Sequence, residues 1–274
     1  IMVPVFNETL NITTLFEAFL KLREELKNRF SLQYILVDDG SDDGTVETAK
    51  QKAGNLDLII LQHEKNIGPG AAFATGFKYL AEHIDEEDWV ITMEGDNTSR
   101  YELIKQMLTR SQEGFDIVFA SPYMYGGGIK QTTFIRKLLS SGANLVVKDL
   151  LGIQGILTVS SFFRLYRAKA LIKMQKVFGP GVLERTGFES MVEMVMKIAM
   201  LKLSLSEVAM ELDSSLRKGK SKMKFLRTIK GYLVLWYYKQ GWMKKLESSK
   251  IRNKKLLLLQ ESLVKKVLIW LNFY

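Results

Sequence analysis

The sequence predicts an α/β fold in which a mainly parallel sheet lies between two layers of helices. Over the first 120 residues, short apolar runs alternate with longer segments of helical periodicity, an order typical of parallel sheets. Polar and glycine-rich motifs follow the apolar runs, as expected where loops leave the carboxyl ends of parallel strands. The 274 residues suffice for one large domain with an appendage.

The expected strands are short runs rich in Ile, Leu and Val, and they lie at 1–6, 34–37, 58–61, 90–93 and 117–120. Between them, apolar residues recur at spacings of three and four, which favours amphipathic helices. These helices are expected at 11–29, 45–53, 70–83 and 101–111.

Beyond residue 120 the alternation is less regular. We expect helices at 136–148 and 189–201, a further strand at 162–166, and a flexible loop at the glycines 126–128. The four prolines, at 4, 69, 122 and 180, are expected in loops.

Charge is distributed unevenly along the chain. Residues 217–274 contain 16 Lys and Arg and two acids, a net charge of +14, whereas residues 1–216 contain 23 basic and 28 acidic residues, a net charge of −5. This asymmetry indicates a near-neutral body and a tail suited to an anionic surface.

Composition excludes several kinds of site. The chain has no cysteine, which excludes disulfides and thiolate metal sites. Its two histidines, His63 and His83, are expected at the surface and argue against a histidine zinc site. The longest apolar run, 150–163, has 14 residues, below the roughly 18 of a membrane span. We expect a chain that lies on a membrane or in solution, and one that lacks some residues before Ile1.

The motif VDDGSDDGT (37–45) joins an expected strand to an expected helix. Asp39 or Ser41 can hydrogen-bond a base or a ribose, whereas Asp42 or Asp43 can cap the helix. The alternative is a capped turn with no ligand.

The motif KNIGPGAAFATGF (65–77) joins the third strand to its helix through small residues. Small residues let the backbone approach a ligand closely. The segment partly matches a dinucleotide-binding glycine pattern, which should however follow the first strand. A tightly packed turn between strand and helix is the alternative.

The motif MEGDNTS (93–99) places Glu94 and Asp96 directly after a buried strand. In extended geometry, side chains two residues apart point the same way, and two such carboxylates repel each other unless a cation lies between them. Oxygen ligands favour Mg²⁺ or Mn²⁺, which typically also bind substrate phosphates. The alternative is an acidic loop tip.

Taken together, PVFNE, VDDGSDDGT, NIGPGAA and the EGD triplet resemble family 2 glycosyltransferases with the GT-A fold. Two later segments, SSFFRLYR (160–167) and RKGKSKMKFLRTIKGYL (217–233), are similar to the dolichol-phosphate mannose synthase branch of polyprenyl-phosphate glycosyltransferases. The resemblance covers about residues 1–235.

The resemblance implies a three-layer α/β/α domain with a mixed, mainly parallel sheet over residues 1–216. Its nucleotide-sugar half would span about 1–120 and its acceptor half about 121–216. Residues 217–274 would form basic amphipathic helices that lie on the membrane surface or bind the acceptor. The alternatives for this tail are helices packed on the catalytic body and, less favoured by the sequence, a nucleic-acid-binding surface.

The resemblance also implies roles for individual residues. The donor would be bound by residues from four loops: Pro4, Phe6, Glu8, Asp38, Asp39, Asn66, Gly68, Gly70, Glu94 and Gly95. Glu94, Asp96 and Thr98 would hold Mg²⁺ or Mn²⁺ on the donor's diphosphate.

The acceptor phosphate would be held by four polar residues of the second half: Arg136, Ser140, Arg217 and Lys220. Asp96, Arg136 and Arg217 would be the catalytic residues. A phosphate monoester has a second pKa of about 6, so the nucleophile is an anion at neutral pH and needs no protein base.

Four positions depart from the pattern of the relatives. Glu94 stands where Asp usually begins the metal motif, and Thr98 where Gln often helps to bind metal. Pro122 replaces an Arg, which removes one expected phosphate contact, and Thr158 lies near a usual Asp.

The implied function is that of an inverting glycosyltransferase. It would move a mannose- or glucose-type hexose from a GDP- or UDP-linked sugar to a dolichyl or undecaprenyl phosphate. We expect it at the cytoplasmic face of a membrane, peripheral or monotopic, with no nucleic acid partner. One alternative is a family 2 transferase that acts on a saccharide or another lipid with Glu189 as base. The other is a nucleotide-sugar-binding membrane protein that has lost catalysis.

Overall fold

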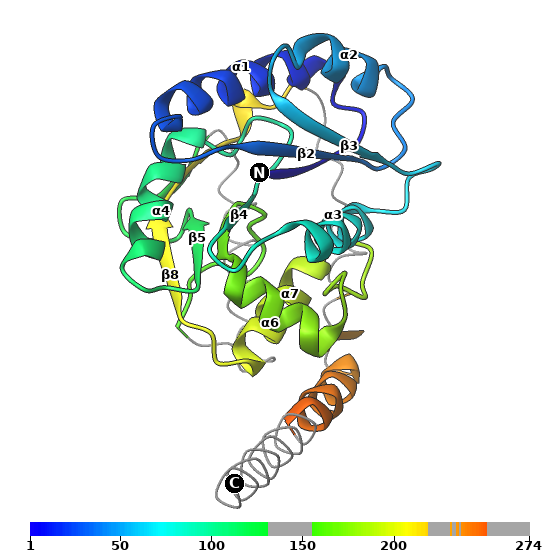
Figure 1. Cartoon of the computed structure of the whole chain (residues 1–274), viewed down its shortest axis with the longest axis vertical. Helices are drawn as coiled ribbons and strands as arrows, with labels where there is room; N and C mark the ends of the chain where they lie inside the picture. The colour runs from blue at the N-terminus through cyan, green and yellow to red at the C-terminus, as the bar shows by residue number, and fades with distance from the viewer. Residues whose placement is uncertain (131–154, 219–230, 232–233, 236, 251–274) are drawn as a thin grey trace, which may run out of the picture.

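The computed structural model describes residues 1–130, 155–218, 231, 234–235 and 237–250 (Figure 1). A seven-stranded sheet in the order β3-β2-β1-β4-β7-β5-β8 forms the centre of this part of the chain. Its strands are β1 (Met2–Val5), β2 (Gln33–Asp38), β3 (Asp57–Gln62), β4 (Trp89–Thr92), β5 (Ile117–Ser121), β7 (Arg164–Arg167) and β8 (Leu205–Ala209). Only β7 runs antiparallel to its neighbours in this sheet, so the expectation of a mixed, mainly parallel sheet is confirmed.

Helices cover both faces of the sheet (Figure 1). One face is packed by α1 (Thr9–Leu26), α2 (Thr45–Lys52) and α4 (Ile104–Gln112), and the other by α3 (Pro69–His83), α6 (Ala168–Phe178) and α7 (Ser190–Met200). Alternate strand residues separate into the two hydrophobic cores, because successive side chains of a strand point to opposite faces. In β2, for example, Tyr34 and Leu36 enter one core and Ile35 and Val37 the other. The three-layer α/β/α architecture is therefore confirmed.

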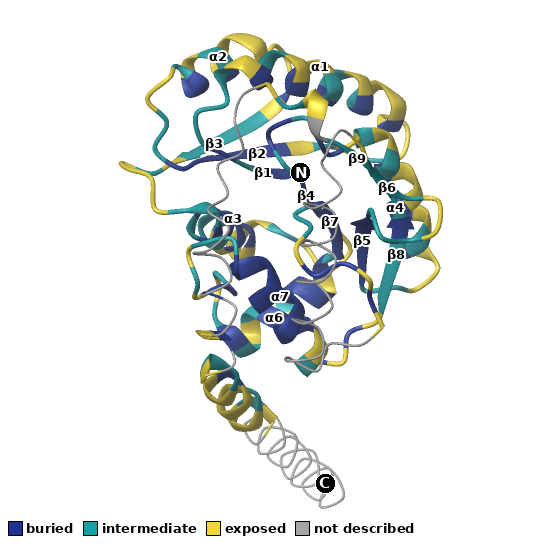
Figure 2. Ribbon diagram, turned by 180° about the vertical axis from the view of Figure 1, so that it is seen from behind, coloured by how far each residue is buried: buried dark blue, intermediate teal, exposed yellow. Residues whose placement is uncertain are grey.

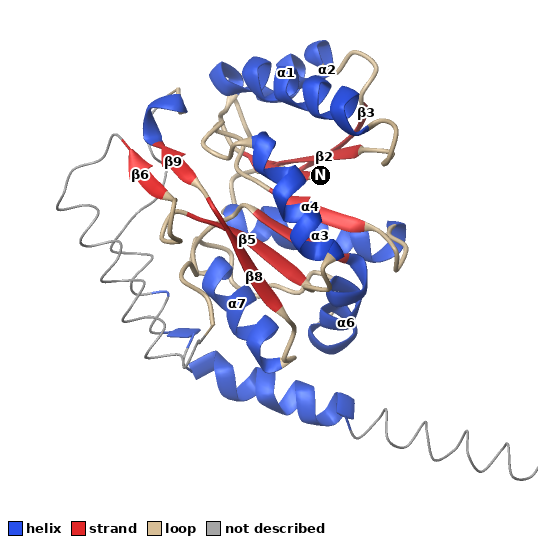
Figure 3. Ribbon diagram, turned by 90° about the vertical axis from the view of Figure 1, so that its left-hand side faces the viewer, coloured by secondary structure: helices blue, strands red, loops and turns tan. Residues whose placement is uncertain are grey.

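A second, two-stranded sheet pairs β6 (Gly128–Lys130) with β9 (Glu211–Asp213) in parallel. Figure 3 shows this ribbon outside the main sheet. The structure also contains two short 3₁₀ helices: η1 (Tyr101–Leu103) precedes α4, and η2 (Ser214–Leu216) follows β9.

The described part of the C-terminal segment packs on the body. Leu235 and Trp242 are buried in the core that also contains α6 and α7, and Tyr238 and Leu246 pack against it. Residues 237–250 form a helix whose other face is exposed (Figure 2). This arrangement agrees with the packed alternative for 231–250, while a domain boundary at 216 stays a prediction. Among the described residues, no helix combines the length and apolar character that crossing a membrane requires.

Two prolines do not lie in loops as expected. Pro4 is inside β1, where the backbone O of the next residue, Val5, accepts from the N–H of Asp39, directly after β2. The backbone N of Pro4 therefore faces β4. Because β1 pairs with β4 only at Met2, opposite Thr92, the N–H that Pro4 lacks removes no hydrogen bond between these strands. Pro69 is the first residue of α3, where a backbone N–H has no partner within the helix.

The expected helices and strands agree with the observed ones to within a few residues, apart from the following differences. The sequence analysis did not identify α6, β8 or the β6–β9 ribbon. The helix expected at 101–111 begins as the 3₁₀ helix η1. The helix expected at 136–148 lies outside the described residues.

Candidate active site

Four loops meet where parallel strands end, because the carboxyl ends of β1, β2, β3 and β4 lie at one edge of the sheet. The loop after β1 is tied to the loop after β2 by three hydrogen bonds from backbone N–H groups. Asn7 donates to Ser41 Oγ at 2.8 Å, Glu8 to Thr45 Oγ1 at 2.8 Å, and Thr9 to Asp43 Oδ2 at 3.1 Å.

Asp38, the last residue of β2, and Asp39, which follows it, hold loops in place. Asp38 is fully buried and accepts from the backbone N–H and the hydroxyl of Ser41. Asp39, also buried, accepts from the backbone N–H groups of Ile67 at 3.0 Å and Gly68 at 2.8 Å. Asp39 therefore organises the loop after β3, and its contact with a base or ribose stays a prediction.

His63 is not the surface residue expected from the sequence. Its side chain is only 11% exposed, with Nδ1 2.8 Å from Asp39 Oδ1 and Nε2 2.8 Å from Thr75 Oγ1. His83, in contrast, is exposed as expected. His63 is buried because it contacts the buried carboxylate of Asp39. The sequence around His63 does not reveal this contact.

The glycines of the loop after β3 approach another backbone segment. A Cβ atom at Gly68 would lie 2.4 Å from Thr186 O, and one at Gly70 2.2 Å from Arg185 O. Gly70 N also donates to Thr186 O at 2.7 Å. Close packing against residues 185–186 thus leaves no room for a side chain at either glycine, and Asn66 is exposed beside them. Donor binding by these three residues stays a prediction.

The acidic motif after β4 forms a turn. The strand ends at Thr92 and residues 95–96 lie in a turn, so the extended geometry assumed for Glu94 and Asp96 is wrong. A Cβ atom at Gly95 would lie 2.7 Å from Val5 Cγ1, which shows how closely this turn packs on the end of β1. We call residues 94–99 the acidic turn.

Hydroxyl groups satisfy the carboxylates inside the acidic turn. Asp96 Oδ1 accepts from the Thr98 hydroxyl at 2.5 Å and from Thr98 N at 3.1 Å. Glu94 Oε2 accepts from the hydroxyl of Ser99. Burial, and secondly the charge of Asp96, raises the pKa of the Glu94 carboxyl to about 7. The two carboxylates are therefore close enough to repel each other, as the sequence analysis expected.

Arg217 supplies the positive charge at this site. Its Nε donates to Asp96 Oδ2 at 2.5 Å, and its Nη2 pairs with the same oxygen. These residues are 121 positions apart, so the fold joins the acidic turn to the first residue of the basic segment. The sequence analysis had assigned the two to different ligands, metal and acceptor.

The carboxylates of the acidic turn can be compared with the ligands that a divalent cation requires. Within the described ranges, no three or more His, Cys, Asp or Glu residues gather into a group that could hold a metal ion. Mg²⁺ is, however, usually held by one or two carboxylates, with substrate phosphates and waters as the other ligands. The carboxylates of Glu94 and Asp96 fit a cation that binds together with a diphosphate. Asp96 already attracts a positive charge, because it is paired with the guanidinium of Arg217.

The remaining predicted residues are placed as follows. Pro4, Phe6 and Glu8 are half-buried at the end of β1, and Glu8 Oε2 accepts from Asn11 Nδ2 at 2.5 Å. Three predicted acceptor residues lie outside the described part of the chain: Arg136, Ser140 and Lys220.

Glu189, the base of the alternative reaction, is enclosed. It is 7% exposed, and its Oε1 lies 3.5 Å from Arg185 Nε. A Cβ atom at Gly187 would lie 2.3 Å from Glu189 Oε2, and one at Gly231 2.8 Å from its Cγ. The chain itself therefore covers this carboxylate on two sides.

Sequence reasoning also missed polar residues that hold other parts of the body together. Glu207 accepts from the N–H groups of Leu157 and Thr158 at 2.8 and 3.0 Å. Glu193 and Lys197 are buried in α7 and lie 2.5 Å apart. Only the latter pair left a signal, two opposite charges at i, i+4 in an otherwise apolar helix.

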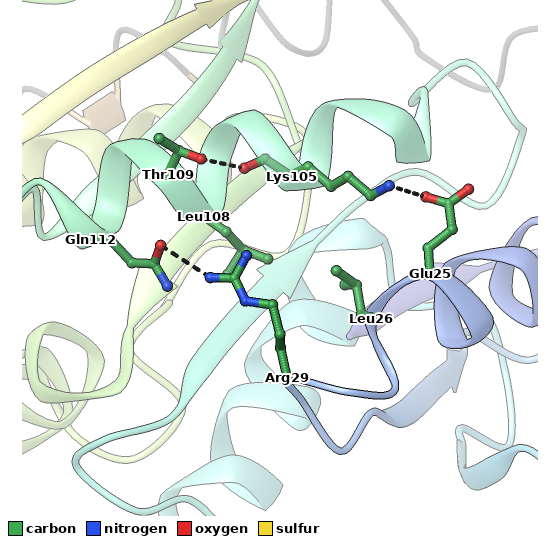
Figure 4. A pocket seen from close by; sticks show the side chains of 7 residues that line it. All are labelled: Glu25, Leu26, Arg29, Lys105, Leu108, Thr109 and Gln112. Carbon is green, nitrogen blue, oxygen red and sulfur yellow. Dashed lines mark hydrogen bonds and ion pairs between the residues drawn. The ribbon is translucent and has the colours of Figure 1, made fainter.

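A shallow groove between α1 and α4 does not belong to this site. It is lined by Glu25, Leu26, Arg29, Lys105, Leu108, Thr109 and Gln112 (Figure 4). Glu25 pairs with Lys105 at 2.7 Å, and Arg29 contacts Gln112 at 3.4 Å. Its α1 side lies at the C-terminal end of that helix, far along the chain from the loop after β1, and its α4 side runs along the whole of α4.

Comparisons with known proteins identify a family and related sequences. The family model described as glycosyl transferase family 2 matches residues 1–174. A dolichol-phosphate mannosyltransferase of Pyrococcus furiosus is 28% identical over 146 residues, which cover 53% of this chain and 39% of that protein. A polyprenol monophosphomannose synthase of Mycolicibacterium smegmatis is 27% identical over 184 residues, 64% of this chain and 63% of that protein. The chain thus spans less than two thirds of the length of these relatives.

Solved structures show the same fold at low identity. Glucosyl-3-phosphoglycerate synthase of Mycobacterium tuberculosis, in complex with phosphoglyceric acid, has a TM-score of 0.59 and 12% identity, and covers 88% of this chain and 79% of its own. The same enzyme with Mn²⁺ and UDP-glucose has a TM-score of 0.57 and 12% identity, with 86% and 76% covered.

Proposed function

Because the chain belongs to glycosyl transferase family 2, we propose that it transfers a hexose from a nucleotide-diphosphate sugar to a polyprenyl phosphate at a membrane surface. The observation that carries this proposal is the contact between Asp96 and Arg217. It joins the turn suited to a donor diphosphate with the first residue of the basic segment, which is suited to an acceptor phosphate.

The donor side rests on the acidic turn. Glu94 and Asp96, with the Thr98 hydroxyl beside them, would hold Mg²⁺ or Mn²⁺ on the diphosphate of a GDP- or UDP-linked sugar. When bound, the cation would offset negative charge on the leaving diphosphate. The Mycobacterium tuberculosis enzyme crystallised with Mn²⁺ and UDP-glucose supports this ligand class.

The acceptor side rests on the β6–β9 ribbon. Lys130 of β6 is paired with Asp213 of β9, and Arg217 follows four residues later at the acidic turn. Arg136 and Ser140 follow β6 in the sequence, so both acceptor segments leave from one ribbon. This common origin supports Arg136, Ser140, Arg217 and Lys220 as ligands of one phosphate.

The proposed reaction is a direct displacement at the sugar. An oxygen of the acceptor phosphate attacks the anomeric carbon from the face opposite the diphosphate. The bond from that carbon to the diphosphate breaks, and the configuration inverts. The acceptor is already an anion at neutral pH, because the second pKa of a phosphate monoester is about 6. The enclosure of Glu189 agrees with a reaction that needs no protein base.

The membrane surface is supported by charge and by exposed apolar side chains. Residues 217–274 carry a net charge of +14, and each Lys or Arg near anionic lipid contributes about 1 kcal/mol. Ile67, Tyr125 and Leu216 are exposed, Tyr125 completely, and they follow β3, β5 and β9. Such side chains suit an interfacial position, which we propose lies at the cytoplasmic face.

A transfer assay tests the proposal. Radiolabelled GDP- and UDP-sugars are offered to the chain with vesicles that contain polyprenyl phosphate, and with vesicles that lack it. We expect label in the lipid only when polyprenyl phosphate and a divalent cation are present. Label transferred instead to 3-phosphoglycerate or to a saccharide would contradict the acceptor class. In that case a Glu189→Gln variant shows whether the other reaction uses this base.

A chain that binds nucleotide sugar but transfers it to none of these acceptors would be the binding protein considered above. The departures at Glu94 and Pro122 are the features that favour this alternative. Binding of UDP- or GDP-sugar without any transfer would therefore overturn the proposed catalysis while leaving the donor site in place.

A further inference from the structure

Asn11 lies in the first turn of α1 and is 1% exposed. Its side chain reaches a residue 207 positions away in the sequence. Asn11 Oδ1 accepts from Lys218 N at 3.0 Å, and Asn11 Nδ2 donates to Lys218 O at 3.1 Å. One carboxamide therefore satisfies both backbone polar groups of Lys218.

The same residue is tied to two of the four loops. Asn11 Nδ2 also donates to Glu8 Oε2 at 2.5 Å. The backbone O of Asn11 accepts from Asn97 Nδ2 at 3.0 Å, and Asn97 has a positive φ of 64° within the acidic turn. Asn11 thus connects the loop after β1, the acidic turn and the start of the basic segment.

These contacts explain how Arg217 is held at the acidic turn. Residues 217–218 have left η2 and lie in no helix or strand, so no regular ladder fixes their backbone. A carboxamide carries both a donor and an acceptor, as a peptide group does, and it can pair with Lys218 on both sides. No other uncharged side chain of this size except Gln offers the same pair of groups.

We propose that Asn11 is a positioning residue that clamps the backbone of Lys218 and thereby fixes Arg217 against Asp96. Asn11 binds the backbone of Lys218 and not the guanidinium of Arg217, so the guanidinium keeps its contact with Asp96 while its backbone is held in place. The statement that this phosphate belongs to the acceptor rests on the proposed function, whereas the clamp itself does not.

The clamp is tested first without substrates. Hydrogen exchange of the Lys218 amide is followed by NMR in wild type, Asn11→Ala and Asn11→Leu. Ala favours the helix, and Leu fills the volume of Asn, so at least one variant should fold. We expect the Lys218 amide to exchange about tenfold faster in both, as the loss of one hydrogen bond implies. Asn28→Leu, at an exposed position in the turn after α1, is the matched control and should leave the rate unchanged.

The positioning role is tested by kinetics. We expect Asn11→Ala to raise the KM for polyprenyl phosphate about tenfold, since a displaced group weakens productive binding. The KM for the sugar nucleotide should rise less, although Asn11 also contacts Glu8. In an Arg217→Ala background, the same substitution should change the acceptor KM by less than about twofold, because residues that act through one another are not additive.

The outcomes separate the two levels of the inference. Unchanged exchange at Lys218 in a folded Asn11 variant would overturn the clamp. An equal rise in both KM values, or a full effect that persists in the Arg217→Ala background, would overturn the positioning role. If the wild-type chain glycosylates no polyprenyl phosphate, the proposed function is wrong. The clamp is then tested by hydrogen exchange at Lys218 alone.

Discussion

Substitution of Lys197 by Met should destabilise the folded chain strongly. Lys197 has no exposed side-chain surface, and its Nζ donates to Glu193 Oε1 at 2.5 Å and to Val182 O at 2.6 Å. The ammonium also lies 4.5 Å from the ring centroid of Trp242, in the C-terminal segment. Glu193 in turn accepts from the backbone N–H groups of Glu184 and Arg185, both at 2.8 Å.

The expected magnitude follows from these contacts. Met fills the volume but leaves the Glu193 carboxylate buried with no cation beside it, and breaking a buried ion pair by removing one partner costs about 3–5 kcal/mol. That is a large fraction of a typical unfolding free energy of about 5–15 kcal/mol. The double variant Glu193→Gln/Lys197→Met should lose less stability than Lys197→Met alone, because no unpaired charge then remains.

Urea unfolding followed by circular dichroism measures both values, with the midpoint and slope fitted for each variant. Lys176→Met, at an exposed position of α6, is the control and should stay within about 0.5 kcal/mol of wild type. If Lys197→Met costs less than about 1 kcal/mol, the ion pair does not stabilise the fold in the way argued here.

Three further predictions concern the site and its supports. Arg217→Ala should raise the KM for polyprenyl phosphate much more than that for the sugar nucleotide, and steady-state kinetics that show equal effects would argue against acceptor contact. The pKa of Glu94 is raised from 4.5 to about 7, so its contribution to stability is complete below pH 4.5 and is lost as pH rises through 7. In EDTA, the unfolding free energy should fall over that window in wild type and fall less in Glu94→Gln; parallel pH profiles would refute this. Gly70→Ala should destabilise the chain by about 1–3 kcal/mol through overpacking, since its Cβ would meet Arg185 O at 2.2 Å. Gly241→Ala, in an exposed helical position with no atom within 4 Å, should stabilise it by up to about 1 kcal/mol, and thermal melts that rank the two variants otherwise would contradict the packing argument.

The order of strands and helices in the first 120 residues could be predicted because it depends on local periodicity. Apolar residues at helical spacing bury one face of α1, and runs such as 34–37 are buried on both sides of the sheet. The edge strand β8 was missed because it is mostly half-buried and includes Ser206 and Glu207, so it lacks a continuous apolar pattern.

The acidic turn was predicted in composition but not in shape. Glu94 and Asp96 lie near each other as expected, yet through a turn that Gly95 allows to pack on Val5. The sequence also gave no reason for Arg217 to be drawn to Asp96. Contacts between residues more than 100 positions apart depend on the whole fold, and no local pattern records them.

The same limit applies to the residues that support the site. Asp39 was read as a ligand of the nucleotide, which stays a prediction, but its contacts with the backbone of the loop after β3 were not foreseen. Asn11 was read only as part of a helix, and it contacts Lys218 across the site. Both side chains are polar and buried, and buried polar groups almost always have partners, but only the fold identifies them.

The account depends most directly on the cation that Glu94 and Asp96 are proposed to share with a sugar nucleotide. Mn²⁺ binding measured by electron paramagnetic resonance, with and without UDP- or GDP-sugar, tests this for wild type and Asp96→Asn at equal protein concentration. We predict that wild type binds Mn²⁺ much more tightly when the matching sugar nucleotide is present, and that Asp96→Asn loses this gain while its circular dichroism spectrum is unchanged. Equal Mn²⁺ binding by the two proteins in the presence of sugar nucleotide would contradict the account.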